Sequence, residues 1–411
     1  MAHTPPERRG SFEQPATWTV VALVAVRVLV LVVIVARAGS IGAVDADIGR
    51  AFRIATSPAI PYRGFPVEFM PLQTGFDRLF LGGTIAAATI KIALTAFFAD
   101  LAAGVALWWA WGRRQAATYL LAGLPLLGVI YLRFDLVSVA LLAWSLALLR
   151  RRFDEGSGVL LGIAVMAKLW PIVLAVPFAL RRARRTLLVA AAACLVIGAW
   201  WYLTGGLKAP FQVLSFRETR GWHVESVVGS VLLVLRRGSP YREADTVRIG
   251  DAAIWAKAVL FVALVAVQAL LWRRARRDRR DPFGAASLAS VAALTVFAPV
   301  FSVQAAAWLL PFIPLALEGD HDERHTAGVA EVTVVLTGVI AVVWRDHAAV
   351  PAAWVGWLVL LRNLVWIDVV VSWLRVRVRP RHDDDDASPP RRRASDAATE
   401  GIEAVLPFEA E

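Results

Sequence analysis

The sequence is poor in the residues on which several common kinds of site depend. Its one cysteine, Cys194, lies within an apolar run, which excludes an internal disulfide and a cysteine-based metal site. Its six histidines are scattered and never show metal-ligand spacing such as His-x-x-x-His. The chain has no Gly-x-Gly-x-x-Gly fingerprint and no phosphate loop. The first apolar run, 18–36, lacks a small-residue cleavage site, so we expect a retained span rather than a cleaved signal peptide.

Charged residues are also scarce, at 19% of 411 residues, whereas 58% are hydrophobic and the mean hydropathy is +0.59. Apolar runs of about 20 residues, long enough to cross a bilayer, recur along the chain. The net charge of +11 comes from arginines clustered between these runs. That is the positive-inside pattern of a membrane protein rather than a nucleic-acid-binding surface. We therefore expect an all-α, polytopic transmembrane helix bundle with no nucleic-acid partner.

The arginine clusters predict about 12 membrane passes, with both chain ends inside the cell. Residues 18–375 would form the transmembrane domain, preceded by a cytoplasmic N-terminal segment, 1–17. The charged, proline-rich residues 376–411 would form a disordered cytoplasmic tail. Two long loops, 38–79 and 204–251, would then lie outside the cell, and their length favours a functional role.

The apolar run 157–180 needs a special interpretation because arginine clusters lie on both sides of it. The sequence Lys-Leu-Trp-Pro at 168–171 interrupts the run, and proline removes a helix hydrogen bond there. We expect two short helices that form a hairpin with its tip directed outward. Counting the run as one pass would invert every later segment.

Ionisable residues also occur inside predicted spans, where they usually face the protein interior. Arg27 and Asp100 lie at similar depth in the first two spans, which predicts an ion pair between adjacent helices. The alternative is that Arg27 reaches a lipid phosphate in a central cavity. We expect Arg362, Asn363 and Asp368 in the last span to face the bundle.

Acids and bases gather at the outer ends of several predicted spans. These polar groups are Asp45, Asp47, Arg50, Arg53, Tyr62, Arg63, Glu68, Arg133, Asp135, Lys168, Arg217, Arg220, His223, Glu225 and Gln304. A carboxylate can take a proton from an attacking hydroxyl, and arginine or lysine can stabilise a leaving phosphate. This pattern suits an anionic, lipid-linked substrate.

Several of these residues also have a purely structural interpretation. Asp45 or Asp47 could cap a loop helix, since aspartate is a favoured N-cap. Glu225 could pair with Arg220, and Lys168 could simply extend toward the membrane interface.

Five short blocks, in this order, make the chain resemble bacterial GT-C-class glycosyltransferases, and more narrowly the actinobacterial α-1,2-mannosyltransferases. The first is Asp-Ile-x-x-Ala-Phe at 47–52 with Pro-Tyr-Arg-Gly-Phe-Pro-Val-Glu-Phe-Met-Pro at 61–71. The others are Arg-Phe-Asp at 133–135, Lys-Leu-Trp-Pro at 168–171, Arg-Gly-Trp-His-Val-Glu-Ser at 220–226, and Val-Phe-Ser-Val-Gln at 300–304 before Trp-Leu-Leu-Pro at 308–311. The similarity extends over roughly residues 20–375.

The resemblance implies an inverting sugar transfer on the extracytoplasmic face of the cell membrane, among membrane lipids. The donor would be a polyprenyl-phosphate sugar, with mannose or arabinofuranose as the sugar, and the acceptor a lipid-linked or cell-envelope glycan. It implies no metal and no cofactor. Asp47 would be the general base, although Asp45, two residues away, is an alternative.

The substrate-binding residues that the resemblance implies are Asp45, Tyr62, Arg63, Glu68, Lys168, Arg217, Arg220, His223, Glu225 and Gln304. Among them, Glu68 and Glu225 would orient sugar hydroxyls or the acceptor. Lys168, Arg217 and Arg220 would contact the lipid phosphate.

The chain departs from the family pattern at several positions. Phe52 replaces a tyrosine, Gly64 an aspartate, Met70 a proline and Val303 a proline. These changes favour, as an alternative, a catalytically silent family member that acts as a scaffold. A polytopic lipid or solute transporter is another alternative, because many passes and broken helices suit one. Against a transporter, the halves show no internal repeat, and both long loops lie on one side.

Overall fold

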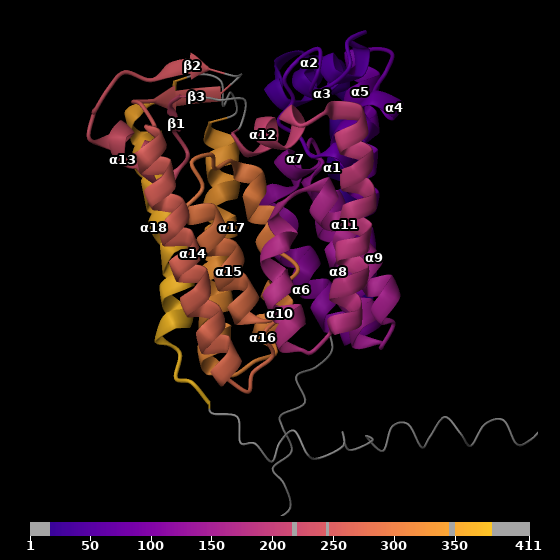
Figure 1. Ribbon diagram of the computed structural model, residues 1–411, viewed down its shortest axis with the longest axis vertical. Coiled ribbons are helices and arrows are strands. Elements are labelled where there is room, and N and C mark those ends of the chain that lie inside the picture. The colour runs from indigo at the N-terminus through magenta and orange to yellow at the C-terminus, as the bar shows by residue number, and fades with distance from the viewer. Residues whose placement is uncertain (1–16, 216–219, 244–245, 345–349, 380–411) are drawn as a thin grey trace, which may run out of the picture.

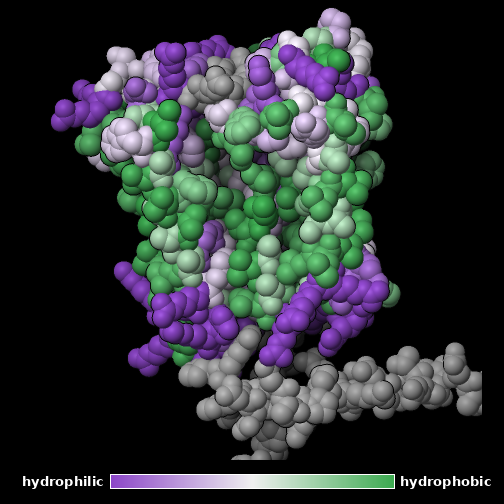
Figure 2. Space-filling view, in the orientation of Figure 1, coloured by the Kyte–Doolittle hydropathy of each residue, from purple (hydrophilic) through white to green (hydrophobic). Residues whose placement is uncertain are grey.

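The structure is a computed structural model, and it describes residues 17–215, 220–243, 246–344 and 350–379. It confirms the predicted all-α bundle of a polytopic membrane protein (Figure 1). Figure 2 shows a broad apolar belt between two polar ends. Most of the two predicted cytoplasmic segments, 1–17 and 376–411, lies outside the described residues, and so does Arg217.

Within the described residues, six helices are long and apolar enough to cross a membrane. They are α1 (Thr17–Ala36), α5 (Ile85–Trp111), α11 (Arg184–Gly205), α14 (Ile254–Arg277), α17 (His321–Val343) and α18 (Ala353–Arg375). Each corresponds to a span that the apolar runs predicted.

The remaining predicted passes are short or broken helices. They comprise α6 (Arg113–Gly123) with η1 (Leu124–Leu126) and α7 (Leu127–Ile130), α8 (Asp135–Arg150), α15 (Ala285–Val296), and η3 (Val303–Leu309) with α16 (Ile313–Leu317). Such breaks are tolerated where the freed backbone groups are buried in protein or line a cavity. Helix α15 fits this rule, because most of its side chains are buried.

The predicted hairpin is also present, as α9 (Asp154–Ala167), η2 (Trp170–Leu174) and α10 (Ala175–Leu180). Glu155 in the first turn of α9 forms an ion pair with Arg185 in the first turn of α11. A Cβ atom at Gly158 or Gly162 would collide with the backbone of α11, so the two helices pack closely and in parallel. Because α10 ends where α11 begins, the chain enters and leaves the hairpin at the same end of the bundle.

That end, here called the arginine end, carries the arginine clusters between helices, which Figure 2 shows as polar groups below the apolar belt. The opposite end, here called the loop end, carries the two long connections (Figure 1). Their helices are α2 (Ala38–Val44), α3 (Ala46–Thr56), α4 (Pro71–Phe80), α12 (Lys208–Leu214) and α13 (Val227–Val234).

The second connection also contains a small antiparallel sheet in the order β1-β3-β2, formed by β1 (Trp222–His223), β3 (Thr246–Ile249) and β2 (Tyr241–Glu243). Trp222 lies opposite Ile249, and Arg242 lies opposite Val247. The sequence did not predict this sheet, because such short strands contain too little alternation of apolar and polar residues.

Helices α1 and α5 are joined by the ion pair that the sequence predicted. Nε of Arg27 lies 2.7 Å from Oδ2 of Asp100, and both side chains are fully buried. The hydroxyls of Tyr119 and Tyr131 donate to the same carboxylate over 2.8 and 2.9 Å. Arg27 also donates to the carbonyl oxygen of Leu120 over 2.7 Å. This enclosed network favours the structural interpretation of Arg27 over contact with a lipid phosphate.

Candidate active site

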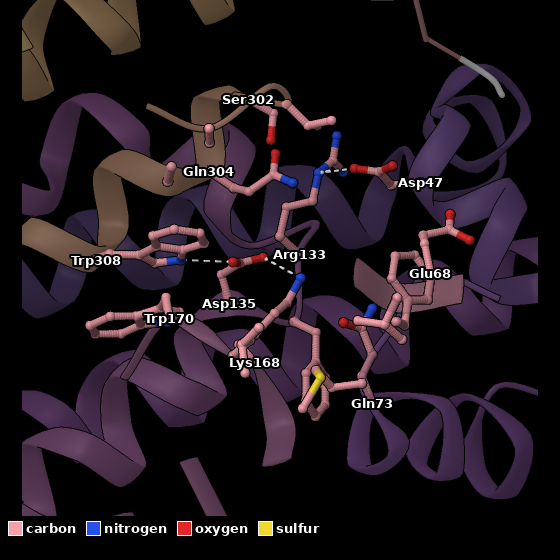
Figure 3. A pocket seen from close by; sticks show the side chains of 18 of the residues that line it. Asp47, Glu68, Gln73, Arg133, Asp135, Lys168, Trp170, Ser302, Gln304 and Trp308 are labelled. Carbon is pink, nitrogen blue, oxygen red and sulfur yellow. Dashed lines mark hydrogen bonds and ion pairs between the residues drawn. The ribbon is translucent and has the colours of Figure 1, made fainter. Parts of the chain in front are cut away.

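A cavity of about 620 Å³ lies where the loop-end helices meet the broken helices of the bundle. Its polar wall brings together side chains from five separate parts of the chain (Figure 3). In that view Asp47 and Glu68 lie on one side, Trp170 and Trp308 on the other, and Arg133, Asp135 and Lys168 between them. The geometry therefore gathers four of the five sequence blocks around one space, and only the block at 220–226 is missing from its lining.

Asp45 and Asp47 have different tasks at the start of α3. Asp45 is the N-cap, and its Oδ1 accepts hydrogen bonds from the backbone N–H groups of Asp47 and Ile48, both over 3.0 Å. Its carboxylate also accepts from Nη1 of Arg133 over 3.0 Å. Capping and pairing occupy Asp45, whereas Asp47 faces the cavity as the second residue of the helix.

The Asp47 carboxylate forms an ion pair with Arg133. Its Oδ2 lies 2.8 Å from Nε of Arg133, and its side chain stays 44% exposed where it lines the cavity. Surrounding protein atoms remove part of the water around this carboxylate, and this desolvation raises the pKa of Asp47 above its ordinary value of 3.8. The Arg133 guanidinium opposes that rise, and Asp45 adds to it. An accessible carboxylate with a raised pKa has the properties of a general base.

Asp135 and Lys168 form a second charged pair on the cavity wall. Asp135 is the first residue of α8, and Lys168 lies at the break between α9 and η2. The Lys168 Nζ lies 3.3 Å from Oδ2 of Asp135, whose Oδ1 accepts from the indole Nε1 of Trp308 over 2.8 Å. The rings of Trp308 and Trp170 stack, with centroids 5.5 Å apart and planes 8° apart. Lys168 is therefore fixed in place rather than extended toward the membrane interface.

The Glu68 carboxylate completes the wall near α3. Its Oε2 accepts from Nη2 of Arg50 over 2.8 Å, and the same nitrogen donates to the carbonyl oxygen of Pro66 over 2.6 Å. Gln304, at the start of η3, lines the cavity from the C-terminal half. Of the residues that the resemblance implied, Asp47, Glu68, Lys168 and Gln304 thus line this cavity.

The other implied residues that the structure describes, Asp45, Tyr62, Arg63, Arg220, His223 and Glu225, lie outside the cavity lining. The Tyr62 hydroxyl donates to the carbonyl oxygen of Phe69 over 2.7 Å, so it braces the first loop. Arg63 donates to the carbonyl oxygen of Leu203 over 2.8 Å. The backbone N–H of Arg220 donates to Glu243 over 3.1 Å.

The block at 220–226 serves mainly to join the second loop to α18. His223 is buried in β1. Oε2 of Glu225 accepts from Nη1 of Arg362 over 3.0 Å, and both side chains are almost fully buried. Asn363 donates to the carbonyl oxygen of Glu225 over 3.1 Å, so Arg362 and Asn363 face the bundle as predicted. Asp368 is partly buried.

Several cavity residues were not assigned a role by the sequence. Arg133 and Asp135 belong to a recognised block, yet their partners become visible only in three dimensions. Trp308 belongs to the Trp-Leu-Leu-Pro motif of the last block, and its hydrogen bond to Asp135 becomes visible only in the structure. Gln73 and Asp77 are four residues apart on α4. This i, i+4 spacing is the feature of the sequence that could have indicated that they share one face of a helix.

These features define a membrane protein whose helical bundle has, at one end, a cavity lined by carboxylates and by cationic side chains. The model of glycosyltransferase family 87 matches residues 64–303, which is more than half of the chain. The chain therefore belongs to glycosyltransferase family 87, a family of GT-C-type membrane glycosyltransferases, as the resemblance indicated. No curated protein matches it.

The matched range includes Glu68, Asp77, Arg133, Asp135 and Lys168 but begins after Asp47. Within the part of the chain that the structure describes, no group of three or more histidine, cysteine, aspartate or glutamate side chains could hold a metal ion.

Proposed function

We propose that this glycosyltransferase moves a sugar, with mannose as the first choice, from a polyprenyl-phosphate donor to an acceptor hydroxyl with inversion. The observation that carries the proposal is that the Asp47 carboxylate, held by Arg133, shares one cavity with the Lys168 ammonium. A base and a cation on one cavity are what the attack of a hydroxyl and the departure of a phosphate require.

Asp47 is the proposed general base. Its carboxylate takes the proton of the acceptor hydroxyl while that oxygen attacks the anomeric carbon of the donor. The bond between the anomeric carbon and the phosphate oxygen breaks, and its electron pair leaves with the polyprenyl phosphate. The raised pKa of Asp47 makes its carboxylate a stronger base than an aspartate in bulk water.

Lys168 is the proposed cation for the leaving phosphate. An ammonium has three N–H donors, and the Lys168 ammonium forms one ion pair among the described residues, with Asp135 at 3.3 Å, so donors remain for a phosphate oxygen. The Lys168 Nζ also lies 5.7 Å from the centroid of the Phe69 ring, which lines the same cavity. Negative charge that develops on the phosphate would be stabilised there.

The cavity continues into an apolar part that suits a polyprenyl chain. It is lined by Ile172 of η2 and by Phe261, Leu264 and Val265 of α14. Phe261 is 65% exposed and Ile172 is 52% exposed. Helix α14 is the least buried of the six long helices, so these side chains extend from the cavity toward lipid. A lipid-linked donor could therefore keep its tail in the bilayer while its phosphate reaches Lys168.

We also infer that residues 18–375 act as one transmembrane domain whose loop end faces the extracytoplasmic side of the cell membrane. The arginine end would lie inside by the positive-inside rule. The acceptor would then be a lipid-linked or cell-envelope glycan. A reporter enzyme that works only outside the cytoplasm should be active when it is fused after residue 215. Activity at this position of a reporter that works only in the cytoplasm would contradict the orientation.

The proposed reaction is tested in membranes that contain the protein, with radiolabelled polyprenyl-phosphate mannose as donor and endogenous lipids as acceptors. Asp47→Asn should lower transfer by about 10²–10⁴-fold, because the base is lost. Asp322→Asn, at the arginine end, is the matched control and should keep full transfer. Full transfer by Asp47→Asn would exclude Asp47 as the base. If the wild type transfers neither mannose nor arabinose from its polyprenyl-phosphate donor, the silent scaffold becomes the better interpretation.

A further inference from the structure

Helix α4 presents two buried acceptor oxygens that have no hydrogen-bond partner among the described residues. They are Oδ2 of Asp77 and Oε1 of Gln73. The residues are only 2% and 6% exposed, respectively, and both line the cavity. Because the two residues are spaced i, i+4, their side chains lie on the same face of the helix.

Burying a carboxylate or an amide oxygen without a donor opposes folding, and most such groups in proteins are paired. Asp77 has cationic Lys168 in its surroundings, and that interaction is weaker than the effect of burial, which raises the pKa of Asp77 well above its ordinary value. No ion pair joins Asp77 to a cation within 4.0 Å in the described part of the chain. A ligand that brings hydrogen-bond donors would satisfy both oxygens at once.

The surroundings restrict the chemistry of that ligand. Asp77 and Gln73 share the cavity wall with the apolar side chains of Phe76 and Ile92. An ionised phosphate has no donors to offer to either oxygen, and it would be repelled by Asp77 whenever that carboxyl is ionised. Neighbouring hydroxyls of a sugar ring can donate to both oxygens, while the C–H groups of the ring contact the apolar side chains.

We propose that Asp77 and Gln73 form the subsite that binds the hydroxyls of the donor sugar. The assignment to the donor follows from Lys168, because a phosphate bound there keeps its attached sugar close to Asp77. This inference rests on the proposed function, since it takes the donor to be a sugar linked to a lipid phosphate.

The test compares two ligands that differ only in the sugar, farnesyl phosphate and farnesyl-phosphate mannose, on the purified full-length protein. The ratio of their Kd values measures the contribution of the sugar alone. In the wild type the sugar should tighten binding by about 10-fold or more, as expected for hydrogen bonds to a charged acceptor. Asp77→Asn and Gln73→Leu should each reduce that advantage to about threefold or less, with the Kd of farnesyl phosphate unchanged. Asp322→Asn should change neither Kd.

The possible results separate the inference from the proposed function. If the wild type binds neither ligand, and the arabinofuranose analogue also fails, the proposed donor is wrong. If it binds farnesyl phosphate but gains nothing from the sugar, the subsite is wrong and the phosphate site stands. An unchanged ratio in both variants, or an equal loss of both ligands, would also overturn the subsite. An effect on the acceptor KM alone would move these residues to the acceptor.

A second measurement does not depend on any ligand. Asp77→Asn should raise the Tm of the ligand-free protein at neutral pH, because folding must either bury the charge of Asp77 or protonate it, whereas an amide has no charge to lose. The difference should disappear below pH 3.8, the ordinary pKa of the carboxyl, where it is protonated in both the folded and unfolded states. A lower Tm for Asp77→Asn at neutral pH would mean that the fold itself satisfies this carboxylate, and would overturn the inference.

Discussion

Nε of Arg133 lies 2.8 Å from Oδ2 of Asp47, while Nη1 of the same guanidinium lies 3.0 Å from Asp45. One arginine between α7 and α8 therefore fixes both acids at the start of α3. A planar guanidinium can bridge two carboxylates in a way that a lysine ammonium cannot. The position of the proposed base thus depends on a residue from a different part of the sequence.

Arg133→Lys should lower kcat by about 10²-fold, because misplacement of a catalytic group by about 1 Å has effects of that size. The measurement is sugar transfer by the variant at saturating donor, with Asp47 intact. Arg184→Lys, an exposed arginine at the arginine end, is the matched control and should retain activity. Normal turnover by Arg133→Lys would show that the bridge does not position the base.

The two acids of this bridge should respond differently to mutation. Asp45→Asn keeps a good N-cap and should keep measurable transfer, whereas Asp45→Ala should lower the free energy of unfolding by about 1 kcal/mol. Asp47→Asn should lower transfer by about 10²–10⁴-fold without that loss of stability. Thermal unfolding and transfer assays on the three variants check this. The reverse pattern, with Asp45→Asn inactive and Asp47→Asn active, would make Asp45 the base.

The pH dependence of kcat/KM should reveal the Asp47 carboxylate. A general base works only when ionised, so activity should fall as the pH drops through the pKa of Asp47, which lies above 3.8. Arg133 opposes that rise in pKa. Arg133→Gln should therefore shift the acidic limb to higher pH, by about one unit or more. A profile whose acidic limb does not move in this variant would contradict the pairing of Asp47 with Arg133 in the active enzyme.

The buried pair of Arg27 and Asp100 should matter for stability rather than for chemistry. Asp100→Leu alone should lower the free energy of unfolding by about 3–5 kcal/mol, because it leaves a buried guanidinium unpaired. The double variant Arg27→Met with Asp100→Leu should cost less than Asp100→Leu alone. Thermal unfolding of the purified protein measures both. A larger loss in the double variant would mean that the pair itself contributes more than its burial costs.

Much of the bundle could be predicted from the sequence, because lipid imposes strong rules on a membrane-spanning chain. The apolar run 18–36 predicted a membrane span, and α1 runs from Thr17 to Ala36. The ion pair of Arg27 with Asp100 followed from their depth, and the hairpin followed from the arginines on both sides of it. These predictions needed only local composition and the cost of charge in a bilayer.

The site was harder to predict, because its partners are far apart in sequence. Asp135 and Trp308 are 173 residues apart, and no local pattern announces their hydrogen bond. Glu225 pairs with Arg362, 137 residues away, and this burial takes it out of the cavity lining. Loops outside the bilayer are free of the rules that constrain spans. Tertiary packing decides which acidic residues of a loop cap helices and which of them face a cavity.

The hairpin of α9, η2 and α10 has a consequence for how the chain is inserted. Since it enters and leaves at the arginine end, it contributes an even number of passes. Its removal would leave the sidedness of every later helix unchanged, whereas loss of α8 alone would reverse it. With the arginine end inside the cell, as we propose, the arginines on both sides of the hairpin can stay on the ribosome's side of the membrane during synthesis. Lys168, at the tip of the hairpin, can thus reach the cavity when the hairpin inserts, without any arginine having to cross the bilayer.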